Sequence, residues 1–386
     1  MKLSRKISGI APSVTLAITA KAKQMKADGI DVVGFGAGEP NFDTPDNIKE
    51  AAIKAIKAGF TKYTPSGGII ELKQAVCEKL KRHNNLSYKP NEVLISCGGK
   101  HTLYNIMEAL LEQGDEAILP SPYWVTYEEQ IKMAGAKPVF VDTSRTDFKL
   151  TAESLKKAIT KKTKLLILNS PSNPSGMIVE RDELKRIAEL AVKHDFVVVS
   201  DEVYESLVYD DKQQVSIASL GEEIKKRTIT VNAVSKTYSM TGWRIGYCAG
   251  PADVIKGMDN LQSHSTSNPC SIAQKAALEA LNGPQDFMKG WLKSFDERRR
   301  YMVERLNRIK GISCIMPEGA FYAFPDISGT GMRSMEFTER LLDEAKVAVV
   351  PGKDFGADGN VRLSYACSME NIKKGLDRIE KFCNPL

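Results

Sequence analysis

Short apolar runs alternate with longer amphipathic helical patterns between about residue 46 and residue 285 of this chain. Several runs are apolar at consecutive positions, as expected for strands that helices cover on both faces. This alternation favours an α/β fold in which a mainly parallel sheet forms a large domain over residues 46–285. The seven expected strands are EVLIS (92–96), EAILP (116–120), KPVFVD (137–142), KLLILNS (164–170), FVVVSD (196–201), TITVNAVS (228–235) and RIGYCAG (244–250).

The C-terminal part of the chain has a different pattern. A long charged helical segment follows residue 285, and three short apolar segments come after it, AFYAFPDIS, VAVVPGKDF and NVRLSYA, separated by turns that contain Gly and Pro. These features predict a smaller α+β domain of residues 286–386. We expect the loop-rich residues 1–45 to lean on this small domain. A chain of 386 residues is long enough for two such cores.

Charge and cysteine usage argue against several classes of protein. The 54 Lys and Arg against 48 Asp and Glu give a net charge of +6, without a block of like charges that would indicate a nucleic-acid partner. The N-terminus lacks the apolar run of a signal peptide, and no segment has the roughly 20 apolar residues of a membrane helix. Seven scattered cysteines without a CxxC pair predict reduced thiols and a cytoplasmic protein. Four isolated histidines without an HExxH motif predict no metal site.

Polar residues directly after apolar runs are the candidates for a site, because ligands of an open α/β sheet bind beyond the carboxyl ends of its strands. Lys236 closes the run TITVNAVS, and a buried lysine there must be paired, deprotonated or covalently used. A lysine whose stem is buried while its ammonium reaches water is the structural alternative. Asp201 ends another run, where its carboxylate would hold a proton on a heteroaromatic nitrogen or cap the next turn. Tyr204 and Asn173 follow two such run ends.

A second group of residues has the chemistry of an anion site. Ser235, Arg244 and the backbone amides of Gly98, Gly99 and Lys100 would together cradle a phosphate, since the glycines precede an expected helix whose first amides bind anions. The other glycine-rich segment, GFGAGEP, has the spacing GxGxG and not the GxGxxG of dinucleotide-binding proteins. Its glycines are better explained as bringing backbone amides close to a small ligand.

Ordered motifs along nearly the whole chain resemble those of the fold-type I aminotransferases. The resemblance is strongest to the bacterial aspartate aminotransferase group of class I, which includes aspartate/prephenate aminotransferases. The motifs are APSVTLAITAKA, AGEPNFDTPDNI, KYTPSGGIIELKQAV, GGKHTLYNIM, SPYWVTY, SPSNPSG, SDEVYE, SKTYSMTGWRIGY, GAFYAF, VAVVPG and VRLSYA. The resemblance implies a pyridoxal-phosphate enzyme of the α/β fold type I, with a seven-stranded sheet in the large domain and a smaller α+β domain.

The resemblance implies roles for residues around the cofactor. Lys236 carries pyridoxal 5′-phosphate covalently and moves the proton of the reaction, and Asp201 keeps the ring nitrogen protonated. Tyr204 and Asn173 contact the ring oxygen, and Trp124 stacks on the ring, with a tryptophan of the core as the alternative. The residues implied for the phosphate are Ser235, Arg244, Gly99, Lys100 and, from the neighbouring subunit of an obligate homodimer, Tyr63.

The resemblance also implies how the α-carboxylate of a substrate binds. Arg362 would grip it with a bidentate fork, helped by the Gly38 amide and by Asn173. Because Arg362 belongs to the small domain and Lys236 to the large one, substrate would draw the two domains together.

The side chain of the substrate would meet Lys100, Ser13 and Thr15. A cation at Lys100 favours acidic side chains, so we predict transamination between L-aspartate or L-glutamate and 2-oxoglutarate or oxaloacetate. Prephenate is the alternative acceptor. It is less favoured because members that accept prephenate often have a lysine where this chain has Ala11.

Three other classes of protein remain as alternatives. A pyridoxal-phosphate C–S lyase would share Lys236, Asp201 and Arg362. A pyridoxal-binding transcription regulator would need an added DNA-binding domain, which we do not expect here. A nicotinamide-dependent dehydrogenase is disfavoured by the lack of a GxGxxG motif.

Overall fold

The structure is a computed structural model that describes residues 3–10 and 14–384. Its main sheet contains β2 (Val93–Ser96), β3 (Glu116–Ser121), β4 (Lys137–Asp142), β5 (Thr163–Asn169), β6 (Val197–Asp201), β7 (Thr228–Ala233) and β8 (Gly246–Ala249). The strand order is β2-β8-β7-β6-β5-β3-β4, and neighbours are parallel except for β8, which is antiparallel to β2 and β7. The predicted α/β class and the mainly parallel sheet of seven strands are confirmed.

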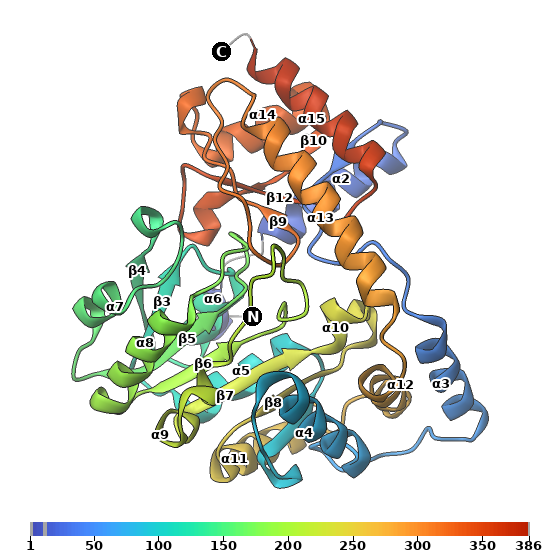
Figure 1. Cartoon of the computed structure of the whole chain (residues 1–386), viewed down its shortest axis with the longest axis vertical. Coiled ribbons are helices and arrows are strands. Elements are labelled where there is room, and N and C mark those ends of the chain that lie inside the picture. The colour runs from blue at the N-terminus through green and yellow to red at the C-terminus, as the bar shows by residue number, and fades with distance from the viewer. Residues whose placement is uncertain (1–2, 11–13, 385–386) are drawn as a thin grey trace.

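Helices cover both faces of this sheet (Figure 1). One face packs against α5 (Gly99–Leu110), α6 (Thr126–Met133) and α11 (Ala252–Ser263). The other face packs against α7 (Ala152–Ala158), α8 (Arg181–His194) and α9 (Glu222–Lys225) on one half, and against α4 (Ile70–Asn84) and α12 (Ser271–Asn282) on the other. Successive residues of β5 alternate between the two cores, Leu165 and Ile167 on one face and Leu166 and Leu168 on the other, which explains its unbroken apolar run.

We call this sheet with its helices, including α3 (Asp46–Lys57) against α12, the large lobe. The small lobe has a three-stranded antiparallel sheet of order β11-β12-β9, from β9 (Tyr322–Ala323), β11 (Val350–Pro351) and β12 (Val361–Ser364). Its helices are α14 (Ser334–Ala345), α15 (Met369–Cys383) and the long α13 (Phe287–Leu306), which runs from the large lobe to the small one (Figure 1).

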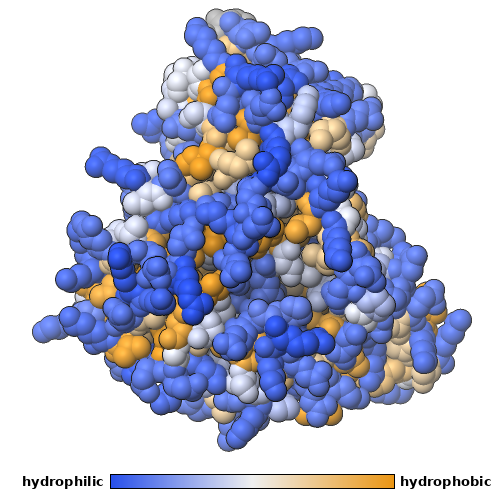
Figure 2. Space-filling model, in the orientation of Figure 1, coloured by the Kyte–Doolittle hydropathy of each residue, from blue (hydrophilic) through white to orange (hydrophobic). Residues whose placement is uncertain are grey.

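The N-terminal segment also contacts the small lobe. β1 (Val33–Gly34) pairs in parallel with β10 (Val347–Ala348), and α2 (Val14–Ala27) contacts β10 and β11 after the short α1 (Arg5–Ser8). The boundaries of the two predicted domains, 46–285 and 1–45 with 286–386, stay a prediction. Within the described residues, none of the helices has the length and apolar content that crossing a bilayer requires. Hydrophilic residues cover most of the face shown in Figure 2.

The expected end of one strand was wrong. TITVNAVS was expected to be strand throughout, but β7 stops at Ala233, and Lys236 lies in the single helical turn α10 (Val234–Thr237). The cause is the neighbouring strand: the pairing of β7 with β8 ends where Ala233 faces Gly246, and Arg244 just before β8 has a left-handed φ of 56°. The chain therefore leaves the sheet at this point, and Lys236 lies beyond the end of the strand.

Candidate active site

A cavity of about 460 Å³ lies between the carboxyl ends of the parallel strands and the small lobe. The predicted site residues that line it from the large lobe are Gly99, Lys100, Trp124, Asn173, Asp201, Tyr204, Ser235, Lys236 and Arg244. Gly38 and Arg362 line it from the other side. Residues that are up to about 320 positions apart in the chain are thus brought to one cavity, at the sheet edge where α/β proteins bind ligands.

Lys236 reaches the cavity from α10. Its Nζ donates a hydrogen bond of 2.5 Å to the carbonyl oxygen of Gly38, which belongs to the N-terminal segment. Burial lowers the pKa of Lys236 to about 8, with further lowering by the charges of Arg362 and Arg244 and opposition from Glu39. An amine with this pKa has a neutral fraction of about a tenth at pH 7, so it can act as a nucleophile and as a base.

Asp201 ends β6 and is buried. Its Oδ2 accepts a hydrogen bond of 2.6 Å from Tyr127 Oη, and its Oδ1 accepts one of 3.2 Å from the Val203 amide. Burial raises the pKa of Asp201, and these two hydrogen bonds and the charge of Lys236 oppose the rise. A carboxylate fixed by two donors in a site of low polarity is well placed to hold a cationic N–H group of a ligand.

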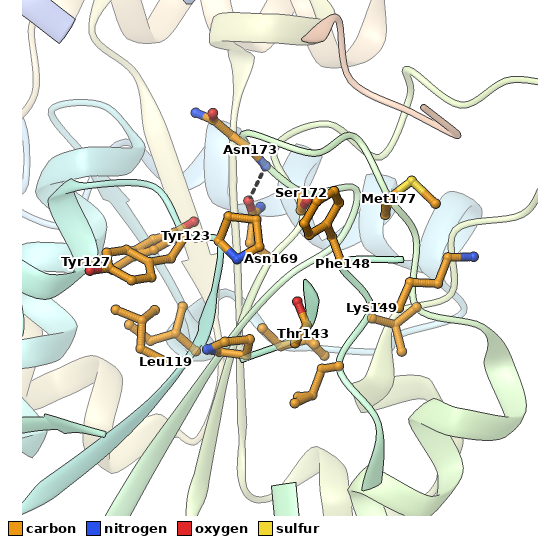
Figure 3. Close-up of a pocket in the computed structure, with 16 residues that line it drawn as sticks. Leu119, Tyr123, Tyr127, Thr143, Phe148, Lys149, Asn169, Ser172, Asn173 and Met177 are labelled. Atoms are coloured by element: carbon orange, nitrogen blue, oxygen red, sulfur yellow. Dashed lines mark hydrogen bonds between the residues drawn. The ribbon is translucent and has the colours of Figure 1, made fainter. Parts of the chain in front are cut away.

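Asn169, at the end of β5, and Asn173, in the turn SPSNPSG, connect Asp201 with Arg362. Asn169 Nδ2 donates to the Asp201 carbonyl at 3.0 Å, and Asn169 Oδ1 accepts from the Asn173 amide at 2.8 Å (Figure 3). The Asn173 side chain then accepts from Arg362 Nη1 at 2.9 Å. The bond between Asn173 and Pro174 is cis. Asn173 is thereby held from both lobes, through its backbone amide by Asn169 and through its side chain by Arg362.

Arg362 lies in β12 and its side chain is almost fully buried. Besides Asn173, it donates from Nη2 to the Gly36 carbonyl at 3.0 Å, and its guanidinium lies 4.5 Å from the ring centre of Tyr322 and 5.2 Å from that of Phe355. Its Nε is buried and has no hydrogen-bond partner among the described residues. Burial lowers the pKa of Arg362, and a buried guanidinium with an unused donor is suited to bind a carboxylate.

An anion cradle forms where α5 begins. Gly98 has a φ of 90°, and a Cβ there would lie 2.4 Å from Arg244 Nη2, so only glycine lets the guanidinium approach the first turn of α5. Arg244 is held by a hydrogen bond of 2.8 Å from Nη1 to the Thr241 carbonyl. The free amides of α5, the Arg244 charge and the buried Ser235 thus surround one corner of the cavity.

Lys100 and Trp124 lie on the side of the cavity next to this cradle. The Lys100 ammonium is 4.9 Å from the centre of the Trp124 ring, and that ring meets Tyr127 edge to face at 5.4 Å. Loss of hydration, and then the charge of Arg244, lower the pKa of Lys100. Two basic side chains, Lys100 and Arg244, thus line the cavity on the side of the partly exposed Trp124 ring.

Comparison with known proteins shows which family the chain belongs to. The family model described as aminotransferase class I and II matches residues 30–379. The chain belongs to this family. It is 52% identical over 386 residues, or 98% of each chain, to the aspartate aminotransferase of Bacillus sp. (strain YM-2). It is 50% identical over 98% of each chain to a probable aspartate/prephenate aminotransferase of Aquifex aeolicus.

Solved structures show the same fold. Aspartate aminotransferase from Thermus thermophilus with maleate matches 99% of each chain with a TM-score of 0.96 and 44% sequence identity. The predicted membership of the bacterial aspartate aminotransferase group and the fold of these enzymes are confirmed.

Three predicted residues are not among the described residues that line the cavity, for different reasons. Tyr63 is 91% exposed and lies outside it. Ser13 lies outside the described residues, and for Thr15 only the backbone, in α2, is described. Their roles stay predictions.

Sequence reasoning missed three residues that organise the site, Tyr127, Asn169 and Tyr322. Each lies inside or beside a motif that was noted: Tyr127 three residues after Trp124 in SPYWVTY, Asn169 directly before SPSNPSG, and Tyr322 in GAFYAF. Their positions were the only signal, since each acts on residues far away in the sequence.

Proposed function

We propose that this aminotransferase moves the amino group between L-aspartate or L-glutamate and 2-oxoglutarate or oxaloacetate, with pyridoxal 5′-phosphate as cofactor. The observation that carries the proposal is that three buried residues line one cavity. They are Lys236, whose amine has a lowered pKa, Asp201 in the large lobe and Arg362 in the small lobe. An amine nucleophile, an acceptor for a ring N–H and a carboxylate fork are what this reaction needs.

The residues present fit this cofactor. Its phosphate fits the cradle of Gly99, Ser235 and Arg244, where a side chain on Gly98 would block the approach. When bound, pyridoxal phosphate supplies an aldehyde that takes up the amino group and a ring that withdraws electrons from the substrate carbon. Trp124 offers a flat, partly exposed face for an aromatic ring.

Each side chain then has a defined task. Lys236 would hold the cofactor covalently through Nζ and, once free, would act as the base that moves the proton of the reaction, which suits its lowered pKa. Asp201 holds a proton on the ring nitrogen through a charge-assisted hydrogen bond. Tyr204 and Asn173 donate to the ring oxygen. These roles are supported by the positions of the four residues around the cavity.

Substrate recognition is proposed for a second set of residues. Arg362 binds the α-carboxylate with its unused Nε–H and its fork, beside the amide of Gly38. Lys100, at the other side of the cavity, binds the side-chain carboxylate, together with Ser13 and Thr15 as expected from the resemblance. The relative solved with maleate, a dicarboxylate, supports a preference for acidic substrates.

Prephenate as amino acceptor is the second candidate. The relative named a probable aspartate/prephenate aminotransferase, at 50% identity over 98% of each chain, favours it. Ala11, the residue that argues against it, lies outside the described residues.

We also propose a homodimer, in which Tyr63 of each subunit reaches the cofactor phosphate of the other. The 91% exposure of Tyr63, and the exposed Ile56 and Ile70 on the helices before and after it in the chain, support a contact with a partner. The cytoplasmic location inferred from the scattered cysteines stays a prediction.

Steady-state kinetics test the proposed activity. The protein, supplied with pyridoxal phosphate, should show the highest kcat/KM for aspartate and glutamate with 2-oxoglutarate, and far lower values for alanine and tyrosine. Amination of prephenate by aspartate or glutamate measures the second candidate. A protein that takes up no cofactor, or one that prefers alanine, refutes the proposal.

Two variants assign the roles. Lys236→Ala should fold and retain the cofactor without a covalent bond, with transamination nearly abolished. Lys100→Gln should raise KM for aspartate more than for alanine, because only aspartate has the second carboxylate. Lys137→Gln, on the exposed side of β4, is the matched control and should leave both KM values unchanged.

A further inference from the structure

Tyr322 lines the cavity but has no task in the proposed function. It lies in β9, within the segment GAFYAF, and its side chain is about 1% exposed. β9 is paired with β12, with Tyr322 opposite Ser364, two positions from Arg362. The strand that carries Arg362 and the strand that carries Tyr322 therefore enter the site as one unit.

Three residues of the site meet at this one side chain. Tyr322 Oη lies 2.9 Å from Tyr204 Oη. The Tyr322 ring centre lies 4.5 Å from the Arg362 guanidinium carbon. A Cβ on Gly38 would lie 3.3 Å from Tyr322 Oη, so the hydroxyl lies directly against the Gly38 backbone. Tyr322 thus connects the large-lobe residue expected at the cofactor with the small-lobe residue expected at the substrate carboxylate.

Only one of the two tyrosine hydroxyls donates in their hydrogen bond. Burial raises the pKa of both, and the charge of Arg362 opposes the rise in both, but for Tyr204 the neighbouring Tyr322 adds to the rise, whereas for Tyr322 its partner Tyr204 opposes it. The separation of the two oxygens allows either hydroxyl to donate, and the Arg362 guanidinium against the Tyr322 ring favours Tyr322 as the donor. With Tyr322 donating to it, the Tyr204 oxygen is satisfied, and the Tyr204 O–H is left to donate into the cavity.

We propose that Tyr322 is a positioning residue that aims and strengthens the hydrogen bond of Tyr204 and transmits the charge state of Arg362 to it. The proposal deepens the proposed function and rests on it. Two hydrogen bonds in a chain polarise each other, so Tyr204 is a stronger donor to a bound ring oxygen while Tyr322 donates to Tyr204. A carboxylate that pairs with Arg362 reduces the positive charge at the Tyr322 ring, and Tyr204 becomes a weaker donor.

The Tyr322→Phe variant of the cofactor-loaded enzyme tests this. The readout is the pH midpoint of the absorbance change of the bound cofactor, measured alone and with the unreactive dicarboxylate maleate. A weaker Tyr204 donor stabilises negative charge on the ring oxygen less, so the midpoint should rise by about 0.3 to 1 unit, a two- to ten-fold change in proton affinity. The shift that maleate causes should be smaller than in the unmodified enzyme.

In the same variant, KM and kcat should respond differently. Phe retains the ring against Arg362, so KM for aspartate should stay within about twofold. The constant kcat should fall several-fold, because the lost hydroxyl acts on the cofactor side. The affinity of the apoprotein for pyridoxal phosphate, measured by titration, should fall in parallel with the weaker Tyr204 contact.

Tyr365→Phe is the matched control. Tyr365 is equally buried in the same core, donates at 3.2 Å to the Ala320 carbonyl, and does not line the cavity. Tyr365→Phe should leave the pH midpoint and the response to maleate unchanged. It should lower the thermal stability by about as much as Tyr322→Phe does.

A Tyr204→Phe background decides whether Tyr322 acts through Tyr204. There, Tyr322→Phe should change the midpoint no further. The inference is overturned if Tyr322→Phe leaves both the midpoint and the maleate response unchanged. It is also overturned if Tyr322→Phe shifts the midpoint equally in the unmodified and the Tyr204→Phe backgrounds. If Tyr322→Phe folds poorly, Tyr204→Phe breaks the same bond from the other side, and a full maleate response in it also overturns the inference. An unmodified protein that takes up no cofactor would instead refute the proposed function.

Discussion

Replacing Tyr127 by Phe isolates the hydrogen bond that Tyr127 donates to Asp201. The substitution keeps a ring that is about 1% exposed and removes only the hydroxyl, which lies 2.6 Å from Asp201 Oδ2. This bond lowers the pKa of Asp201 against the effect of burial. A hydrogen bond to a charged group contributes about 1.5–3 kcal/mol, which corresponds to about 1 to 2 pKa units.

Without this hydrogen bond, the ionised form of Asp201 should be less stable by about 1.5–3 kcal/mol. We expect kcat/KM for aspartate at neutral pH to fall about 10-fold, at the lower end of this range, because the Val203 amide still donates to the other oxygen. Since the pKa of Asp201 rises, the acidic limb of the profile of kcat/KM against pH should move to higher pH.

The assay is the full pH profile of kcat/KM for Tyr127→Phe beside a matched variant. Tyr123→Phe is suitable, since Tyr123 is buried on the same segment and donates at 2.5 Å to Glu128, but it does not line the active-site cavity. It should leave the profile in place. A Tyr127→Phe enzyme with an unmodified profile would refute the idea that Tyr127 sets the charge of Asp201.

Three further predictions follow from the geometry. Arg362→Lys cannot reproduce the planar fork, so KM for aspartate should rise about 10-fold or more in steady-state assays, and an unchanged KM would place the α-carboxylate elsewhere. Gly98→Ala should weaken cofactor affinity about 10-fold in titrations of the apoprotein, because its Cβ meets Arg244, whereas Gly242→Ala, with open space around it, should not. Burial, and then the charge of Glu205, raise the pKa of Glu202 to about 7, so its contribution to stability is complete below its unfolded pKa of about 4.5 and is lost as pH rises through 7. The free energy of unfolding should therefore fall by about 3 kcal/mol over this window, and Glu202→Gln should flatten the curve in urea titrations at several pH values.

The large lobe was predictable because its strands are covered on both faces. Consecutive apolar residues such as Leu165 to Leu168 can be satisfied only in such a sheet, and the polar residue that ends each run then marks its carboxyl edge. That rule brought Asp201 and Asn173 to the site without knowledge of the structure.

The supporting hydrogen bonds were not predictable in the same way. Tyr127 reaches Asp201 across 74 positions, and Tyr322 reaches Tyr204 across 118, so no local pattern contains either pair. The turn at Lys236 was missed for a related reason, since β7 ends where its partner strand ends and not where its own apolar residues do. Local chemistry specified which residues enter the site, whereas long-range packing decided what holds them.

The meeting of the two ends of the chain has a consequence for how the protein is made. β1 pairs with β10, and the Gly36 carbonyl accepts from Arg362, 326 positions later in the sequence. During translation, β1 therefore stays unpaired until residue 348 has emerged, while the seven strands of the large sheet are complete once residue 249 has been added. We expect the nascent sheet to fold early, whereas the contact between Arg362 and Gly36 can form only after β12 has been synthesised.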